Sequence, residues 1–558
     1  MRRGSAVRVA PVTTQLSIPA ALEAVAAAVP DRECFVFRGR RWSWRSFNER
    51  SRRFGRYLVD AGLGLRRRPE DCANWESPHD HVALYLHNGN EYLEAMIGSY
   101  KARCAPININ YRYVAEELRY VLRDAGAAVV VVHSTFTPTL AEVLDQLDPR
   151  PAVVQVADES GLPLLDGAVW YEDVLATSDP ALPDELVASW TPDDLYVIYT
   201  GGTTGMPKGV LWRQGDFLEA ALGVAKPVDE LAAAAPRSTL RTLPSAPFMH
   251  GAAHWNALSA WLGGGTVVVQ DQPSRLDPAD VWATCEREGV TALQIVGDAF
   301  ARPLLAELDG HHYDLSKLRF LLTGGAVLSP QNKAAFLEHL PGLTVVDVLG
   351  SSESGRQAVR NIKSSAGDDA ATFQAGPHAR VLDDFMERVL EPGDEQSGWL
   401  GQAGAVPRGY LGDEAKTART FPTIDGVRYA VAGDRARMRA DGSLELLGRD
   451  SVTINSGGEK IFAEEVEQAI KSHPAVDDVI VVGRPSERWG NEVVAVVQLR
   501  DGERATPDEA LLDAASAHIA RYKLPKAIVR VDEVQRSPSG KADYRWAKQV
   551  AAGSAAAG

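Results

Sequence analysis

A glycine- and threonine-rich segment is the strongest candidate for chemistry in this sequence. Residues 199–210 read Tyr-Thr-Gly-Gly-Thr-Thr-Gly-Met-Pro-Lys-Gly-Val and directly follow an apolar stretch. Glycines let backbone N–H groups approach a polyphosphate, hydroxyls donate hydrogen bonds, and a lysine supplies positive charge. The segment therefore predicts a phosphate-binding loop, whose candidate contacts are Thr200, Gly201, Gly202, Thr203, Thr204, Gly205 and Lys208.

This loop differs from the Walker A motif. That motif needs Gly-Lys-Ser/Thr at the start of a helix, whereas Lys208 lies between Pro207 and Gly209. A kinase or motor ATPase is therefore disfavoured. The structural alternative is a glycine-rich surface turn, and the number of phosphate-competent residues after one strand argues against it.

Further short motifs follow the loop in a fixed order. They are Thr323-Gly324-Gly325-Ala326, Leu349-Gly350-Ser351-Ser352-Glu353, Tyr429 to Asp434, Gly448-Arg449-Asp450 with residues 454–460, and Arg536 to Lys541. Each is weak alone, because an isolated Glu353 is usually a solvated carboxylate, a Gly-Asp pair is usually a turn, and a lysine near a chain end is usually solvated. Their order is what gives them weight.

Taken together, the motifs resemble those of the adenylate-forming superfamily, which includes acyl-CoA synthetases, firefly-luciferase-like enzymes and adenylation domains of nonribosomal peptide synthetases. The resemblance extends over nearly the whole chain. It implies an enzyme that joins a carboxylate to ATP as an acyl adenylate. A carboxylate is already ionised at neutral pH, so this reaction needs positioning and charge neutralisation rather than a general base.

The resemblance also implies roles for individual residues. Lys541 would be the adenylation lysine, Glu353 the Mg²⁺ ligand, and Asp434 the acceptor of the ribose hydroxyls. Asp450 would be the hinge between a large domain and a small mobile one. The remaining implied contacts are Gly325, Ala326, Gly350, Ser351, Ser352 and Arg449 for the nucleotide, and Gly457 and Gly458 for a tunnel that admits the pantetheine arm of CoA.

The sequence departs from the family pattern at three positions. Leu349 replaces a common aromatic residue, Gly201 stands where many relatives have serine, and the proline before Lys541 is one residue closer than usual. The second departure removes one hydroxyl from the phosphate loop. Thr200, Thr203, Thr204 and Lys208 would therefore carry more of the phosphate binding.

The acyl pocket is expected between the loop and the adenine motif. Met249, His250, Trp255 and Gly324 would line it, and residues 296–300 would form another wall. His250 either gates the thiolation tunnel or is a satisfied pocket histidine. Residues 107–113 and 454–467 look closest to bacterial long-chain and steroid-type acyl-CoA ligases, which implies a hydrophobic, long-chain or polycyclic carboxylate.

The elements that must position these residues point to an α/β fold. Short apolar, β-branched runs near residues 127–132, 195–199, 266–270, 293–296 and 343–348 alternate with helical stretches, which favours mostly parallel sheets. After residue 449 a compact α+β pattern predicts a small C-terminal domain. We therefore expect a large domain over 1–449 and a small one over 450–558. Glu464 to Glu467 are expected to stabilise a helix N-terminus.

Composition excludes several other classes of protein. A net charge of −15 gives no basic surface for nucleic acid, and no run of 18 apolar residues predicts a membrane span. Four cysteines without metal-ligand spacing fit free thiols in a cytoplasmic protein. A homodimer is compatible with the sequence, but no motif supports one.

Three functions remain open from the sequence. The leading one is an acyl-CoA ligase that uses ATP, Mg²⁺ and CoA, with an acyl-carrier protein as an alternative thiol donor. The second is a family member that performs one half-reaction, either making an adenylate or consuming one. The third, a non-catalytic nucleotide-binding module, is disfavoured because Lys208, Glu353 and Lys541 occur together.

Overall fold

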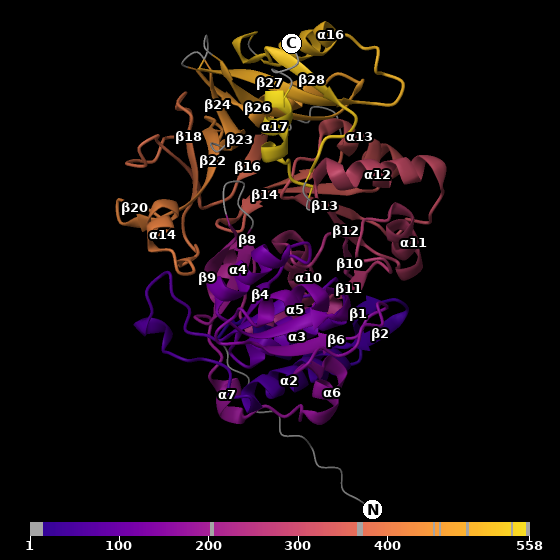
Figure 1. The fold of residues 1–558 in the computed structure, drawn as a ribbon, viewed down its shortest axis with the longest axis vertical. Helices are drawn as coiled ribbons and strands as arrows, with labels where there is room; N and C mark the ends of the chain where they lie inside the picture. The colour runs from indigo at the N-terminus through magenta and orange to yellow at the C-terminus, as the bar shows by residue number, and fades with distance from the viewer. Residues whose placement is uncertain are drawn as a thin grey trace, which may run out of the picture.

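The structure is a computed structural model that describes residues 15–200, 206–364, 372–449, 452–456, 459–486, 490–519, 521–536 and 540–553. Figure 1 shows the N-terminal layers at one end of the molecule and a smaller C-terminal sheet with its helices at the other. The mixed α/β class with a large and a small part is confirmed.

The largest sheet has 13 strands in the order β17-β18-β22-β23-β16-β15-β14-β13-β12-β10-β11-β1-β2. Within this sheet, neighbouring strands from β1 through β11, β10, β12 and β13 to β14 pair in parallel. From β14 through β15 and β16 to β23 and β22 they pair antiparallel, so the expectation of mostly parallel strands holds for one half of this sheet. Its strands are β1 (Glu33–Phe37), β2 (Arg40–Ser43), β10 (Arg241–Pro244), β11 (Thr266–Val269), β12 (Ala292–Ile295), β13 (Phe320–Gly324), β14 (Thr344–Ser351), β15 (Gly355–Ile362), β16 (Thr372–Ala375), β17 (Ala379–Leu382), β18 (Gly398–Gln402), β22 (Ala430–Met438) and β23 (Ser443–Arg449).

A five-stranded parallel sheet and a three-stranded sheet complete the strand layers next to the phosphate loop. The first is β4 (Ala105–Asn108), β3 (His81–Tyr85), β5 (Ala127–His133), β6 (Ala152–Val156) and β7 (Val169–Trp170). The second is β19 (Gly409–Tyr410), β9 (Lys208–Arg213) and β8 (Leu195–Thr200), and β20 (Thr423–Ile424) pairs only with β21 (Val427–Arg428).

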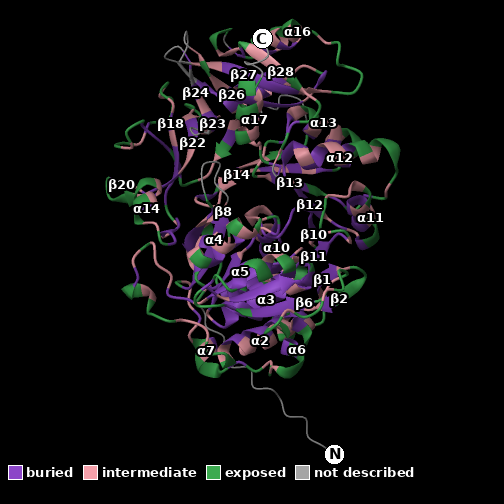
Figure 2. Cartoon of the chain, viewed as in Figure 1, coloured by how far each residue is buried: buried purple, intermediate pink, exposed green. Residues whose placement is uncertain are grey.

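Alternating side chains join the two N-terminal cores. On β3, Val82 and Leu84 belong to the larger core, whereas Ala83 and Tyr85 belong to the second. The period of two puts successive side chains on opposite faces of a sheet, so strands buried on both faces read as continuous apolar runs. Figure 2 shows this burial through the N-terminal layers, with exposed residues on the outer helices.

Helices cover the N-terminal sheets and several carry explicit end signals. Ser43, Asp277 and Ser329 accept backbone N–H bonds as N-caps, and Gly126 and Gly289 end helices in the left-handed conformation. The helices are α1 (Ile18–Ala28), α2 (Trp44–Asp60), α3 (Asn90–Lys101), α4 (Ala115–Ala125), α5 (Thr137–Leu144), α6 (Tyr171–Thr177), α7 (Asp184–Ala188), α8 (Gln214–Ala220), α9 (Val228–Ala234), α10 (Gly251–Leu262), α11 (Pro278–Glu288), α12 (Gly297–Gly310), α13 (Pro330–His339) and α14 (Glu414–Thr420).

The C-terminal part has its own sheet with helices on both faces. Val479 and Val481 pack with α15 and α16, whereas Ile480 and Val482 pack with α17. Its elements are β24 (Thr453–Ser456), β25 (Glu459–Phe462), α15 (Ala463–Lys471), β26 (Val476–Ser486), β27 (Gly490–Leu499), α16 (Asp508–Ser516), β28 (Ala527–Val531) and α17 (Tyr544–Gly553).

The sheets change where the domain boundary is predicted. The hairpin of β22 and β23 turns at Gly442, and β23 ends at Arg449, while β24 already belongs to the C-terminal sheet. Asp450 lies outside the described residues, so its hinge role stays a prediction. No helix in the described part of the chain is long and apolar enough to cross a membrane.

Candidate active site

The predicted adenine and magnesium motifs follow neighbouring parallel strands of the largest sheet. The turns after β12, β13 and β14 lead into Gly297, Gly325 and Ser352 respectively. In open α/β sheets, ligands bind in the crevice beyond these strand ends. The fold therefore brings the adenine and magnesium motifs to one edge, and Trp212 of β9, the strand after the predicted loop, contacts this edge at the Ser352 carbonyl.

The phosphate loop is anchored at both of its ends. Thr200 and Lys208 face each other across β8 and β9, and the loop residues between them, Gly201, Gly202, Thr203, Thr204 and Gly205, lie outside the described residues. A Cβ on Gly209 would come within 2.8 Å of the Tyr199 ring, so only glycine fits where the loop returns.

Asn108 fixes the start of the loop. Its Oδ1 accepts from the Tyr199 N–H at 2.7 Å, and its Nδ2 donates to the carbonyls of Tyr199 and Met249 at 2.8 and 2.7 Å. The side chain thus ties β4 to the loop and to the expected acyl wall. From the sequence, Asn108 was expected only as part of a segment that resembles relatives. An asparagine at the end of a strand can bond to neighbouring backbone groups, so its position could have indicated this role.

Lys208 lies at the loop exit, and its ammonium contacts Asp124 at 3.2 Å. The Tyr199 hydroxyl donates to the same carboxylate at 2.9 Å. Burial alone would lower the pKa of Lys208, but Tyr120 and Asp124 together raise it. Lys208 is therefore charged, and a phosphate would compete with Asp124 for it.

Close packing surrounds the predicted adenine motifs. A Cβ on Gly350 would come within 2.2 Å of the Gly355 carbonyl, and one on Gly324 within 3.0 Å of the Val348 carbonyl. Gly325 has a φ of +83° and precedes Ala326. These glycines let two strand ends and the turn after β13 lie side by side, as the motif's small residues predict. Leu349 packs against an apolar cluster of the antiparallel half.

Glu353 lies in a turn that is held by hydrogen bonds. The N–H groups of Glu353 and Ser354 donate to Ser351 Oγ, and Trp212 Nε1 donates to the Ser352 carbonyl at 2.9 Å. The Tyr410 hydroxyl donates to Glu353 Oε1 at 2.9 Å. Burial and the neighbouring carboxylate raise the pKa of Tyr410, so the hydroxyl keeps its proton. Sequence reasoning missed Tyr410, which follows Glu353 by 57 residues.

Mg²⁺ would fit Glu353 as a single protein carboxylate. The described residues contain no group of three or more His, Cys, Asp or Glu side chains that could hold a metal alone. Mg²⁺ usually keeps several waters and binds through one or two carboxylates together with substrate phosphates. The donor set thus suits a metal that arrives with ATP.

Asp434 is buried on β22 and lies opposite Arg449 of β23 in the strand register. The hairpin therefore brings two predicted nucleotide contacts onto neighbouring strands. Gly457 and Gly458, the predicted tunnel residues, lie outside the described residues.

The C-terminal part reaches the N-terminal site at Gly540 and Lys541. A Cβ on Gly540 would come within 3.1 Å of the Val296 carbonyl and 3.2 Å of the Ala299 Cβ. Burial first, and then the nearby charge of Lys541, lower the pKa of His250 to about 3. Lys541 thus lies near His250, on the acyl side of the site.

His250 is a neutral imidazole with an unusual environment. Its Nε2 is buried and has no hydrogen-bond partner among the described residues. The alternative of a fully satisfied pocket histidine is therefore not what the structure contains. A polar group of a substrate or of the pantetheine arm could fill this position.

Trp255 and Met249, two residues of the expected acyl wall, are fixed by different contacts. Trp255 Nε1 donates to the Tyr196 hydroxyl at 2.6 Å, and that hydroxyl meets His254. Met249 is only 1% exposed and packs in the second core, where its sulfur accepts from the Tyr111 N–H. The Met249 side chain therefore supports the wall from behind.

Asp298 does not lie where the sequence predicts it. Residues 296–300 were expected in a pocket wall, but the Asp298 carboxylate accepts from the Ser329 N–H and the Asn332 amide at 2.8 Å and pairs with Lys471 at 3.4 Å. It therefore belongs to the contact between the N-terminal and C-terminal parts. The acidic helix start is confirmed for Glu464 and Glu465, which lie in the first turn of α15, whereas Glu467 is buried and accepts from the Val481 N–H at 2.9 Å.

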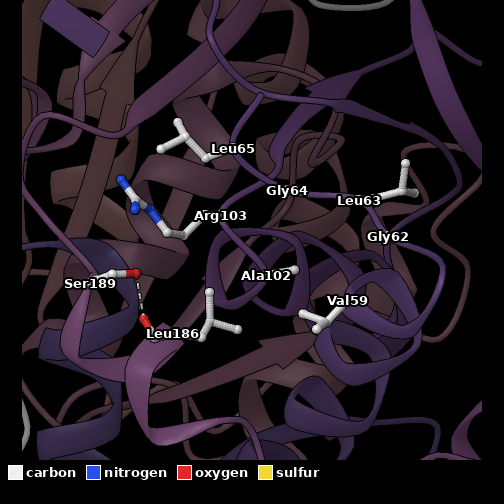
Figure 3. Close-up of a pocket in the computed structure, with 9 residues that line it drawn as sticks. All are labelled: Val59, Gly62, Leu63, Gly64, Leu65, Ala102, Arg103, Leu186 and Ser189. Atoms are coloured by element: carbon white, nitrogen blue, oxygen red, sulfur yellow. Dashed lines mark hydrogen bonds between the residues drawn. The ribbon is translucent and has the colours of Figure 1, made fainter. Parts of the chain in front are cut away.

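A cavity of about 260 Å³ lies away from all these residues. Figure 3 shows Arg103 and Leu186 among the side chains that line it. Arg103 is held by Asp194 at 2.6 Å. None of the predicted site residues lines this cavity, so it is separate from the candidate active site.

Two protein-family models match most of the chain. The model for AMP-binding enzymes matches residues 22–411, and the model for the AMP-binding enzyme C-terminal domain matches residues 465–541. These two matches include the phosphate loop, Glu353 and Lys541.

Related proteins are similar over almost their whole length. The chain is 51% identical to the medium-chain acyl-CoA ligase Mig of Mycobacterium avium, over 97% of this chain and 99% of that protein. It is 38% identical to a 3-oxocholest-4-en-26-oate–CoA ligase of Rhodococcus rhodochrous, over 96% and 95%. The anthranilate CoA ligase AuaEII in complex with anthranoyl-AMP has the same fold, with a TM-score of 0.80 at 20% identity over 98% and 99%. The chain belongs to the AMP-binding enzyme family, the adenylate-forming superfamily that its motifs resemble.

Proposed function

We propose that the protein is an ATP-dependent acyl-CoA ligase for hydrophobic carboxylates. In the first step a carboxylate oxygen attacks the α-phosphate of ATP, forming an acyl adenylate and releasing pyrophosphate. In the second step the thiol of CoA attacks the acyl carbonyl, forming a thioester and releasing AMP. The observation that carries the proposal is the packing of Gly540 against Val296 and Ala299, which brings the charge of the neighbouring Lys541 close enough to act on His250.

Adenylation brings two anions together, so positive charge is the chief requirement. Lys208 and Lys541 would supply it from positions far apart in the chain, and the threonines of the loop would donate hydrogen bonds. Mg²⁺ bound at Glu353 would neutralise phosphate charge, and Tyr410 orients the Glu353 carboxylate through its hydrogen bond.

The second step needs the C-terminal part to move. Gly540 packs against Val296 and Ala299, so CoA could not approach from that side while Lys541 is in place. We propose domains over residues 1–449 and 450–558, with Asp450 as the hinge and Gly457 and Gly458 beside the pantetheine arm in the second orientation.

The acyl group is proposed to be a medium or long chain or a fused-ring carboxylate. The names of the relatives with 51% and 38% identity point to these two classes. The sequence offers no recognisable acidic partner for an amino-acid amine near the expected wall at Trp255, which fits both classes. We place the protein in the cytoplasm because its four cysteines are free thiols.

A carboxylate panel with ATP, Mg²⁺ and CoA tests this proposal. Pyrophosphate, AMP, adenylate and thioester should be followed separately. Thioester formed from free acid supports the ligase, adenylate without thioester supports a half-reaction enzyme, and thioester only from supplied adenylate supports the split form. No turnover with fatty or steroid acids would contradict all catalytic forms.

Lys541→Ala gives a residue-level check. Because the lysine charge serves only the first step, the variant should lose adenylation by at least about a hundredfold and keep thioester formation from supplied adenylate. ATP–pyrophosphate exchange measures the first step. Equal rates of exchange in the variant and the parent would show that Lys541 has no role in adenylation.

A further inference from the structure

Six charged side chains lie where the C-terminal part meets α12. Asp298 and Arg302 come from α12, and Lys471, Asp477, Asp478 and Arg536 come from the C-terminal part. None of them carries a role in the proposed chemistry. Figure 1 places α12 next to the C-terminal sheet, at the boundary between the two parts.

Asp478 is the centre of this cluster and is only 2% exposed. Arg302 reaches it from α12, with Nη2 at 2.9 Å from Oδ2, and Lys471 reaches its other oxygen at 3.0 Å. Arg302 Nη1 also donates to the Asp477 carbonyl at 2.6 Å. Burial alone would raise the pKa of Asp478, but these cations and Arg536 lower it, so the carboxylate is ionised.

Arg536 continues the line of contacts towards Lys541. Its Nε and Nη2 bind the two oxygens of Asp478 at 2.6 and 2.8 Å, and its Nη1 donates to the Gly540 carbonyl at 3.3 Å. The Gly540 carbonyl belongs to the peptide bond that leads into Lys541. A continuous chain of polar contacts therefore runs from α12 through Asp478 and Arg536 to the lysine segment.

The charges balance on each side of the contact. Asp298 and Arg302 cancel on the N-terminal side, and two aspartates, Lys471 and Arg536 cancel on the other. Asp298 also keeps its bonds to Ser329 and Asn332, and Asp478 keeps Arg536, if the two parts separate. An unpaired buried charge would strongly destabilise the separated state, and neither side would contain one. The contact can thus open without a large penalty.

We propose that Arg302 is a positioning residue for adenylation, which acts through Asp478 and Arg536 to hold Lys541 in the site. This inference rests on the proposed function. It assigns the cluster to the first half-reaction alone, because the contacts across α12 exist only while the lysine segment is docked. Arg302 itself touches neither nucleotide nor acyl group in this role.

The test compares two half-reactions in Arg302→Gln. ATP–pyrophosphate exchange with decanoate, or with the panel acid that the parent uses fastest, measures adenylation. Thioester formation from the matching supplied acyl adenylate and CoA measures the second step. We expect exchange to fall at least tenfold, thioester formation to stay within twofold of the parent, and Arg302→Lys to recover exchange to within threefold.

Arg530→Gln is the matched control, because Arg530 binds Asp508 at 2.6 Å within the C-terminal part. It should leave both half-reactions within twofold of the parent. Lys471→Gln removes the other cross-contact and should reproduce the selective loss, which keeps the test valid if Arg302→Gln does not fold.

Two results would overturn the inference. Exchange within twofold of the parent in Arg302→Gln would show that docking does not depend on the cluster. Equal losses in both half-reactions would show a general structural role. A parent that exchanges with no acid in the panel would instead contradict the proposed function, so the two failures are distinguishable.

Discussion

At the scale of single residues, the candidate site depends on partners that hold its functional groups in place. Tyr410 is the clearest case, because its hydroxyl orients the carboxylate that would bind Mg²⁺. Asn108 does the same for the start of the phosphate loop. Neither residue reacts, yet each restricts a group that must meet ATP.

Tyr410→Phe should weaken the use of magnesium. A hydrogen bond to a charged group contributes about 1.5–3 kcal/mol, so we expect roughly a tenfold loss of exchange at limiting Mg²⁺, with recovery at high Mg²⁺. Titrating Mg²⁺ in the exchange assay measures this. Tyr313→Phe removes a similar bond to Glu307 of 2.6 Å on α12 and serves as the control. A Mg²⁺ dependence equal to that of the parent would contradict the role of Tyr410.

At the scale of elements, the short segment from Arg536 to Ala542 carries the lysine into the site. These two residues form an isolated antiparallel bridge, and Gly540 between them has a φ of +75°. Gly540 therefore adopts the left-handed conformation that favours glycine. A Cβ at this position would force the Val296 carbonyl or the Ala299 methyl group to shift.

Gly540→Ala should selectively impair adenylation. A left-handed conformation costs an L-residue about 1–2 kcal/mol, and the new methyl group would also press on the Val296 carbonyl. We expect exchange to fall at least about tenfold while thioester formation from supplied adenylate persists. Gly502→Ala is the control, because Gly502 has a φ of +87° in open space. Equal losses of exchange in the two variants would mean that backbone strain, and not the contact with Val296 and Ala299, causes the loss of adenylation.

At the scale of the whole molecule, several buried histidines link stability to pH. Burial is the first cause that lowers the pKa of His79, His133 and His250 to about 3, and of His87 and His254 to about 4. His79 shows the neutral form directly, since Nε2 accepts from the Leu195 N–H and Nδ1 then donates to the Arg103 carbonyl.

Unfolding should therefore become easier below pH 6.5. In that range the unfolded chain binds protons that the folded chain does not, so stability falls as pH falls until the folded pKa values near 4 and 3 are reached. Each fully buried histidine costs about 1 kcal/mol of stability per pH unit. Melting temperatures at pH 7.5, 6.5 and 5.5 test this, and a flat profile would contradict it. His79→Gln should reduce the slope, whereas His311→Gln, whose side chain is 67% exposed, should not.

Features that depend on neighbouring residues could be predicted from the sequence, whereas contacts between distant residues required the tertiary structure. The sequence by itself determined the α/β class and the order of the motifs, and it predicts the phosphate loop, because strand periodicity, glycine requirements and turn chemistry act over a few residues. It could not reveal Asn108 on Tyr199, Tyr410 on Glu353, or Arg302 on Asp478, since these pairs are 91, 57 and 176 residues apart. It also misplaced Asp298 in a pocket wall. Only tertiary packing decided those contacts, because burial and charge pairing depend on which elements meet.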